Sequence, residues 1–237
     1  MLHAMVTRGL DSLQRPESLA RRAYLALRKA IRDRVIAPDT LYSELQLAAS
    51  LNISRTPVRE ALIELSREGI IEVVPQRGFR VRPISAEEER EVFDLRAAIE
   101  CYVVRRLAES ASEKDVAKLN AILDRQEKAA DDLVRFLEHD EQFHLTMPEL
   151  LGLARSRELL NTLRGIMFLA GSAALALPER TSEVTKEHRR VVKAIAAHDA
   201  DRAVAAITDH LDRTRSHATG RAPAARNGTR ELVKAAR

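Results

Sequence analysis

Four side chains with metal-binding chemistry fall on the inward faces of three predicted helices. Asp140 and His144 are four residues apart, so on a helix their Cβ atoms lie about 5–6 Å from each other. His188 and His210 lie on the apolar faces of two later helices. A buried carboxylate is costly unless it is paired or metal-bound, and imidazole with carboxylate suits Zn²⁺, Ni²⁺, Mn²⁺ or Fe²⁺. The pattern predicts a divalent metal site, with zinc favoured; for each histidine alone, an ordinary hydrogen-bonded core residue is the alternative.

Arg96 is a further inward-facing ionisable residue. It shares a helical face with Val92, Ile99 and Val103, and a buried guanidinium can bind a carboxylate through two parallel hydrogen bonds. Arg96 is therefore a candidate for binding a carboxylate effector. An ion pair with Glu100, one turn further along the same helix, is the alternative, and the spacing does not separate the two.

A second set of functional candidates lies at the start of a predicted helix near residue 55. Ser54 fits the N-cap position and Pro57 fits the first turn. Arg55, Thr56 and Arg59 lie away from the apolar face of this helix. Two arginines near a helix N-terminus can enter the major groove of DNA and bond guanine edges or phosphates. A solvated basic face on an ordinary helix is the alternative.

The neighbouring elements favour the DNA-binding interpretation. Two helices precede the arginines and two short strands follow the helix that bears them, at residues 24–36, 43–51, 70–74 and 79–82. The strands are joined by the turn Pro75-Gln76-Arg77-Gly78. This order predicts a winged helix-turn-helix, in which Arg77 at the wing tip, together with Arg80, can reach phosphate or the minor groove.

The rest of the chain is predicted to be helical. From Ser85 onward the apolar spacing follows the helical period, which predicts about six antiparallel helices in a bundle. The predicted fold is mainly α, with a winged helix-turn-helix at residues 1–83 and a helical effector-binding and dimerisation domain at residues 84–219. Residues 220–237 hold few large apolar side chains and are predicted to be a disordered basic tail.

Charge and composition restrict the class of protein. Residues 1–83 hold 14 Lys/Arg and 9 Asp/Glu, residues 84–219 hold 20 and 25, and residues 220–237 hold 5 and 1. A basic head on an acidic body favours DNA binding through the head alone. The single Cys101 excludes an internal disulfide and suits a reducing cytosol. Without a signal peptide or an apolar run of about 20 residues, we expect a cytoplasmic protein with no membrane contact.

The first domain carries a family signature. Its residues are Ser54-Arg55-Thr56-Pro57-Val58-Arg59-Glu60-Ala61-Leu62, then Glu68-Gly69-Ile70 and Arg77-Gly78. Over about residues 20–83 this pattern resembles the GntR family of bacterial regulators. The resemblance implies that Arg55, Thr56 and Arg59 contact DNA and that Gly78 approaches the DNA backbone. Two departures are Pro38-Asp39, where the family usually has Pro-Gly, and Leu45, where some members have an arginine.

A second signature lies in the helical domain. Its residues are Asp94-Leu95-Arg96, Ile99-Glu100, Asp140, Phe143-His144, Glu187-His188, Ile195 and Asp209-His210-Leu211. Over about residues 85–217 they resemble the FCD effector domain of FadR-type GntR regulators. The resemblance implies that Asp140 and the three histidines hold a metal, that a small carboxylate such as a hydroxy acid or sugar acid binds there, and that Arg96 faces the effector. Ser156-Arg157 stands where the family commonly has Asn-Pro.

The predicted function is effector-controlled transcriptional regulation, with repression favoured because most relatives are repressors. A homodimer binds double-stranded DNA at an inverted repeat, and a small organic or sugar acid at the metal shifts the placement of the two heads. One alternative is a DNA-binding protein whose metal is purely structural. Another is a metal-dependent hydrolase with Glu100 as base; the DNA-binding head argues against it, and we predict no enzymatic activity.

Overall fold

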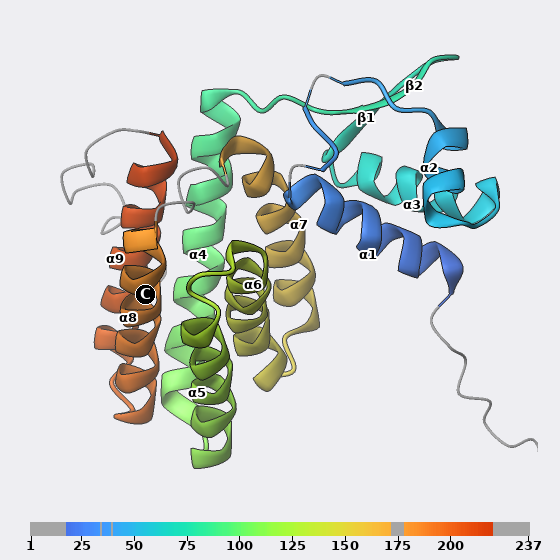
Figure 1. Ribbon diagram of the computed structural model, residues 1–237. Coiled ribbons are helices and arrows are strands. Elements are labelled where there is room, and N and C mark those ends of the chain that lie inside the picture. Colours follow the sequence, from blue (N-terminus) through green and yellow to red (C-terminus); the bar gives the residue numbers. More distant parts are fainter. Residues whose placement is uncertain (1–17, 34, 39, 172–177, 220–237) are drawn as a thin grey trace, which may run out of the picture.

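The computed structural model describes residues 18–33, 35–38, 40–171 and 178–219. Its elements, in chain order, are α1 (Leu19–Arg32), α2 (Glu44–Leu51), α3 (Arg55–Arg67), β1 (Ile71–Val74), β2 (Gly78–Val81), α4 (Ala86–Ser110), α5 (Glu113–Lys128), α6 (Leu133–Leu150), α7 (Ala154–Gly171), α8 (Pro178–Ala196) and α9 (Ala200–Thr219) (Figure 1). The predicted fold class is confirmed: a winged helix-turn-helix with an antiparallel hairpin precedes a bundle formed by α4 to α9. The tail predicted for residues 220–237 lies outside the described residues.

The N-terminal domain packs α1, α2, α3 and the hairpin around one apolar core. Tyr24 of α1 and Val58 of α3 are almost fully buried in it. The turn from α2 to α3 is short because Asn52 adopts a left-handed conformation, with φ 51°, which Asn tolerates better than most residues. The turn brings Arg59 of α3 within hydrogen-bond distance of Glu44 at the start of α2.

The wing, strands β1 and β2, is attached to the loop before α2. The two strands pair from Ile71↔Val81 to Val74↔Gly78. Tyr42 in the loop exchanges two backbone hydrogen bonds with Phe79, at 2.8 and 2.9 Å, and the two rings stack with centroids 5.7 Å apart. Phe79 also enters the core of the domain, so the wing is fixed to the body of the head.

The C-terminal domain is organised around α4, a helix of 25 residues. It packs against α9, α7, α8 and α6, while α5 contacts α6 and α8. In Figure 1, α8 and α9 lie on one side of α4, and α6 and α7 on the other, next to α1. Leu107, Leu119, Phe143, Val191 and Ile207 belong to the apolar core between these helices. No described helix has the length and apolar character needed to cross a membrane.

Two helix starts and one N-cap differ from the sequence-based expectation. Helix α1 begins at Leu19 rather than residue 24, because the Ser18 side chain accepts a backbone N–H of the first turn. Helix α8 begins at Pro178, where we expected a break until Ser182; proline is well tolerated at the first position of a helix. Ser54 occupies the N-cap position of α3, but its side chain makes no capping hydrogen bond.

Helix α1 joins the two domains through buried and half-buried polar contacts. Arg28 donates to the Oδ1 and backbone oxygen of Asn161 on α7, at 2.7 and 2.5 Å, and pairs with Glu141 of α6 at 3.1 Å. Arg32 reaches the second oxygen of Glu141 at 3.3 Å. We call these four residues the interdomain joint. Part of the basic charge of the head is thus used against the acidic body rather than left for DNA.

A glycine allows the two domains to approach closely at this joint. A Cβ at Gly165 of α7 would lie 2.8 Å from the Ile70 Cδ1 atom and 3.3 Å from Nη2 of Arg28. The first of these distances is shorter than real Cβ contacts. The head therefore packs directly onto the backbone of α7 at this point.

Replacing Gly78 with alanine is expected to destabilise the winged domain. Gly78 has φ +132°, and a Cβ there would lie 2.1 Å from the carbonyl oxygen of Tyr42. Because that oxygen belongs to the backbone, it cannot move aside cheaply. We expect the free energy of unfolding, measured by urea titration, to fall by about 2 kcal/mol or more. Arg77→Ala, at the exposed wing tip, is the control and should stay within about 0.5 kcal/mol of wild type; equal stability of Gly78→Ala and wild type would contradict the close approach.

Candidate metal centre and nucleic-acid interface

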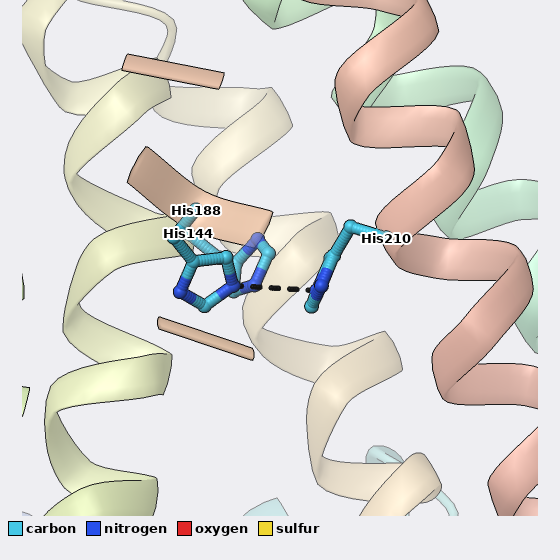
Figure 2. Close-up of side chains that lie close together, drawn as sticks. All are labelled: His144, His188 and His210. Atoms are coloured by element: carbon cyan, nitrogen blue, oxygen red, sulfur yellow. Dashed lines mark hydrogen bonds between the residues drawn. The ribbon is translucent and has the colours of Figure 1, made fainter. Parts of the chain in front are cut away.

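Three histidines from three helices converge in the interior of the bundle (Figure 2). His144 of α6, His188 of α8 and His210 of α9 are all buried, and one ligand nitrogen from each lies within 4.8 Å of the others. The Nε2 atoms of His188 and His210 are 3.3 Å apart. All three are residues that the sequence predicted as metal ligands, and the structure brings them together.

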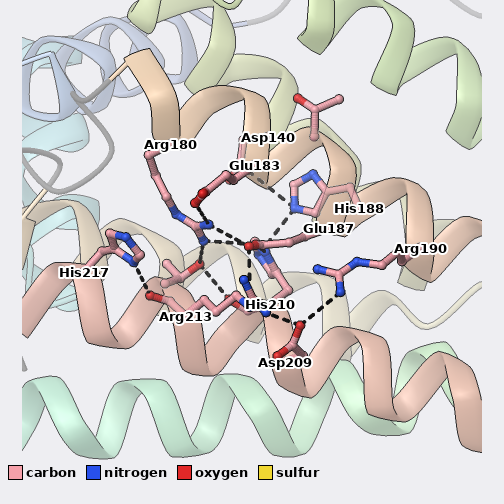
Figure 3. A network of polar contacts seen from close by, with 12 residues as sticks. Asp140, Arg180, Glu183, Glu187, His188, Arg190, Asp209, His210, Arg213 and His217 are labelled. Atoms are coloured by element: carbon pink, nitrogen blue, oxygen red, sulfur yellow. Dashed lines mark hydrogen bonds and ion pairs between the residues drawn. The ribbon is translucent and has the colours of Figure 1, made fainter. Parts of the chain in front are cut away.

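The outer nitrogen of each ring is held by a different helix. The Nδ1 atom of His144 lies 2.6 Å from Glu100 Oε2 on α4. The Nδ1 atom of His188 lies 3.0 Å from Gln126 Oε1 on α5. The Nδ1 atom of His210 lies 2.8 Å from Glu187 Oε2 on α8, and Figure 3 shows Glu187 beside the His210 ring. Because each partner atom is an acceptor, a neutral ring carries its proton on Nδ1 and leaves Nε2 unprotonated, as an acceptor.

This proton assignment has a chemical consequence at the centre of the cluster. Two neutral rings with protonated Nδ1 atoms place two acceptor nitrogens, His188 Nε2 and His210 Nε2, 3.3 Å apart. Two acceptors cannot hydrogen-bond to each other, so the pair requires a shared proton or a cation. A histidine with Nδ1 bound to a carboxylate or carbonyl and Nε2 directed inward is the usual arrangement of a metal ligand. The donor set therefore fits a divalent metal.

Asp140 lies at the edge of the same cluster. Its Oδ1 atom is 3.7 Å from His188 Nε2 and accepts a hydrogen bond from Gln126 Nε2 at 3.2 Å. Its Oδ2 atom accepts a short hydrogen bond from Arg164 of α7. Burial raises the pKa of Asp140, but the Arg164 guanidinium and the three neighbouring histidines together outweigh burial and hold the pKa well below its usual range. Asp140 is thus an ionised carboxylate with one oxygen facing the histidines.

Arg96 forms the ion pair with Glu100 that its spacing allowed, and it also contacts the histidine cluster. Its Nε donates to Glu100 Oε1 at 2.5 Å, which is the ion pair within α4 that the spacing allowed. Its Nη2 also lies 3.1 Å from His144 Nε2, on the inward side of that ring. Arg96 is only 2% exposed, so it presents a guanidinium edge to the histidine cluster.

Two of these histidines, His144 and His188, are held neutral by their surroundings. Burial and the neighbouring His210 lower the pKa of His188 to about 3. Burial lowers the pKa of His144 well below its ordinary value, with further contributions from Arg164 and Arg96. Neutral imidazole is the form that binds metals, so at neutral pH both rings are ready to act as ligands.

The polar residues that position this cluster were not predicted from the sequence. Gln126 lies fully buried on α5 and bridges His188 and Asp140. Arg164 is 3% exposed and holds Asp140 from α7. The available signal was a polar residue on an apolar helical face: Gln126 follows Leu123 by three residues and is buried with it.

A buried ion pair supports the His210 side of the cluster. Arg180 of α8 donates to both oxygens of Glu187, at 2.6 and 3.0 Å, and to Thr214 of α9 at 3.3 Å (Figure 3). Burial raises the pKa of Glu187, but hydrogen bonds from His210 and Arg180 lower it to about 2. Glu187 is therefore an ionised acceptor that fixes the His210 ring.

The candidate DNA-contact residues of the recognition helix lie on the surface. Arg55, Thr56 and Arg59 are exposed in the first two turns of α3. Both arginines face Glu44 at the start of α2: Arg59 donates to its two oxygens at 2.9 and 3.1 Å, and Arg55 Nη2 lies 3.6 Å from Oε2. Arg77 is exposed at the wing tip, and Gly78 is partly exposed beside it.

Sequence comparison relates both domains to one group of proteins. The profile of the bacterial regulatory proteins of the gntR family matches residues 19–81, and the FCD domain profile matches residues 91–213. The chain is 31% identical over 190 residues to the HTH-type transcriptional repressor RspR of Escherichia coli (strain K12), covering 79% of this chain and 83% of the relative. It is 28% identical over 193 residues to the gluconate operon transcriptional repressor of Bacillus licheniformis, covering 78% and 79%.

Comparison with solved structures gives the same architecture. The structure of E. coli McbR/YncC matches with a TM-score of 0.79 and 20% identity, over 86% of this chain and 99% of that chain. A GntR transcriptional regulator from Rhodococcus sp. RHA1 matches with a TM-score of 0.72 and 24% identity, over 85% and 97%. At these identities the likeness shows the shared fold alone.

The buried neutral histidines predict that the metal-free protein loses stability in mild acid. The unfolded chain takes up a proton at His188 below pH 6.5, whereas the folded chain resists this until about pH 3. Stability is therefore full above pH 6.5 and falls toward pH 3. Between pH 7 and pH 5 we expect His188 alone to remove about 2 kcal/mol, and His144 acts in the same direction.

Urea titrations of the chelated protein at pH 7 and pH 5 measure this loss. His188→Gln should reduce the pH dependence, whereas His217→Gln, on the exposed end of α9, should leave it unchanged. A flat profile between pH 7 and pH 5 would show that the folded protein protonates these rings freely.

Proposed function

This chain belongs to the GntR family of bacterial regulatory proteins and carries an FCD domain, and on that premise we propose a repressor controlled by a small carboxylate at a divalent metal. Like these relatives, it is a transcriptional regulator and not an enzyme. One observation supports the metal most directly: the Nε2 atoms of His188 and His210 face each other at 3.3 Å while both Nδ1 atoms are engaged.

Asp140, His144, His188 and His210 are the residues that would hold the metal. Three neutral imidazoles and one carboxylate suit Zn²⁺ best, with Ni²⁺, Mn²⁺ or Fe²⁺ as alternatives. The ion supplies a Lewis acid that binds a carboxylate oxygen. Gln126, which bridges His188 and Asp140, and Glu187 fix the orientation of these ligands.

The charge balance of the site supports an anionic effector. Around the cluster, each of three buried arginines pairs with a buried carboxylate: Arg96 with Glu100, Arg164 with Asp140, and Arg180 with Glu187. The histidines add no charge when neutral. A divalent ion therefore adds two positive charges that these pairs do not offset, and a bound carboxylate restores part of the balance. Arg96, with its Nη2 beside His144, is the residue we propose to bind the effector together with the metal.

The ligand class is a small organic or sugar acid. A relative that is 28% identical is named for the gluconate operon, which agrees with a sugar acid as one member of this class. The site lies among closely packed helices, with His144 and His188 fully buried, so a small ligand fits the proposal better than a large one.

The DNA contacts we propose are Arg55, Thr56 and Arg59 on α3 and Arg77 and Gly78 on the wing. All but Gly78 are exposed, and α3 presents its first turns to solvent, as a recognition helix must. We propose that a homodimer places two such heads on an inverted-repeat operator, because a two-fold dimer matches a two-fold DNA site.

Control of DNA binding is proposed to pass through α6 and α7. Asp140 on α6 is followed directly by Glu141 of the interdomain joint. Arg164 on α7 is followed by Gly165, a point of close approach to the head. A ligand that moves Asp140 or Arg164 therefore moves residues that hold α1. Such a connection biases the position of the head by differential contacts, which is the physical requirement for allosteric coupling.

Metal binding and then effector binding are each expected to stabilise the protein against thermal unfolding. After chelation, Zn²⁺, Ni²⁺ or Mn²⁺ should raise the melting temperature, and one acid from a panel of organic and sugar acids should raise it further. A ligand at about 100 times its Kd adds about 2.7 kcal/mol. Both shifts should disappear in His188→Ala.

His217→Ala is the matched control, because His217 is exposed on the same helix as His210. It should keep both shifts. A metal shift without a shift from any acid would support a purely structural metal, and the absence of any metal shift in wild type would reject the metal site altogether.

Breaking the interdomain joint is expected to uncouple effector from DNA. Glu141→Gln removes the charge that Arg28 and Arg32 contact. Fluorescence-anisotropy titrations give the Kd for operator DNA with and without the acid identified by the thermal screen. The ratio of these two Kd values should be about fivefold smaller in this variant than in wild type. Glu149→Gln on the same helix, outside the joint, is the control. An unchanged ratio in Glu141→Gln would exclude the joint as the route.

A further inference from the structure

Glu44 is an acidic residue in the middle of a surface proposed to bind a polyanion. It is the first residue of α2, and its side chain is 20% exposed, against 60% and 63% for Arg55 and Arg59, which cover it. Arg59 donates Nε and Nη2 to its two oxygens at 2.9 and 3.1 Å, whereas Arg55 makes only a 3.6 Å contact. A carboxylate on a surface that binds DNA repels phosphates, so it weakens binding unless it contributes something in return.

Helix capping does not account for this carboxylate, and its charge in the first turn of α2 stabilises the helix only slightly. Exposed ion pairs contribute little to folding. The N-terminus of α2 is already capped, because the Ser43 side chain accepts from Gln46 N at 3.1 Å and Gln46 Oε1 accepts from Ser43 N at 3.0 Å. The role of Glu44 therefore concerns the arginines that it contacts.

The geometry of Arg59 points to base recognition. A guanidinium carries five N–H donors in one plane, and Glu44 uses one edge of it, Nε and Nη2. The remaining donors, on Nη1 and the outer side of Nη2, form the end that bonds guanine O6 and N7 bidentately. An arginine fixed along one edge loses the freedom to swing toward phosphates, so its free end is preorganised for a base.

We propose that Glu44 is a specificity-determining residue that holds Arg59 edge-on so that Arg59 reads a guanine in each half-site. This inference rests on the proposed contact of Arg59 with DNA. Glu44 acts through Arg59 and disfavours non-specific binding, because its own charge faces the phosphates. Arg55, held only loosely, remains available for phosphate or a second base.

The test begins with selection of binding sites by the full-length wild-type protein from a random duplex library. Kd values are then measured for the selected duplex, for variants with each half-site guanine changed to adenine, and for a scrambled duplex. In wild type, one guanine change should weaken binding by about tenfold. In Glu44→Gln this penalty should shrink to about twofold, while affinity for the scrambled duplex rises.

Two variants distinguish the positioning of Arg59 by Glu44 from the simple loss of a negative charge. Glu60→Gln removes one negative charge from exposed α3, where no ion pair of Glu60 is present among the described residues, and should keep the guanine penalty. Glu44→Asp keeps the charge but shortens the side chain, so it should lose most of the penalty without the rise in non-specific affinity. Thermal melting of each variant checks that the head remains folded.

Arg59→Lys connects the effect to its proposed target. Lysine keeps the charge but lacks the planar fork, so the guanine penalty should disappear, and adding Glu44→Gln should cause no further loss of selectivity. An unchanged penalty in both Glu44 variants, with the penalty lost in Arg59→Lys, would overturn the role of Glu44 and leave the DNA contact standing. If no guanine in the site selected by wild type depends on Arg59, both the role of Glu44 and the contact of Arg59 with a base would be overturned.

Discussion

The burial of ionisable groups in the helical bundle is the constraint on which the remaining structure depends. Charged side chains leave water at a cost of several kcal/mol each, which is offset only by close partners and complete hydrogen bonding. Here every helix of the bundle supplies a member of the buried cluster: Glu100 from α4, Gln126 from α5, Asp140 and His144 from α6, Arg164 from α7, Glu187 and His188 from α8, and His210 from α9. The cluster therefore fixes the relative positions of six helices, and a shift of one helix breaks a contact of another.

The same packing explains how a buried site can influence a distant surface. Helices α6 and α7 each carry a cluster residue next in sequence to a residue of the domain contact, Asp140 beside Glu141 and Arg164 beside Gly165. Successive residues on a helix point about 100° apart, so one face meets the cluster while the adjacent face meets α1. Since a helix moves largely as a rigid unit, displacement at the site reaches the joint without a chain of intermediate side chains.

Periodicity explains which parts of this arrangement were predictable. The four-residue spacing of Asp140 and His144 placed both on one face, and the apolar neighbours of His188 and His210 turned them inward, as the structure shows for all four. For Gln126 the local signal was only its place on an apolar helical face. Its role, like that of Arg164, depends on partners 14 to 62 positions away in the chain. The hairpin could be predicted from its turn residues. The contact between Glu44 and Arg59 could not, because it depends on the left-handed turn at Asn52, whose conformation only the folded chain defines. The helix starts at Leu19 and Pro178 were missed because the first depends on the Ser18 cap and the second on a proline at the first helical position, and apolar periodicity reports neither.

The distribution of arginines in the head refines the simple picture of a basic domain that faces DNA. Arg28 and Arg32 of α1 are engaged with Glu141 of the bundle, and Arg82 after the wing pairs with Glu88 at the start of α4. The excess of positive charge in the head therefore serves two surfaces, one toward the acidic body and one at α3 and the wing. Arginines that pair with the body are not free to bind phosphates without regard to sequence. The same charge distribution therefore affects both the docking of the head and its selectivity for DNA. Under the proposed function, a ligand that loosens the joint would alter the electrostatics of the head as well as its position.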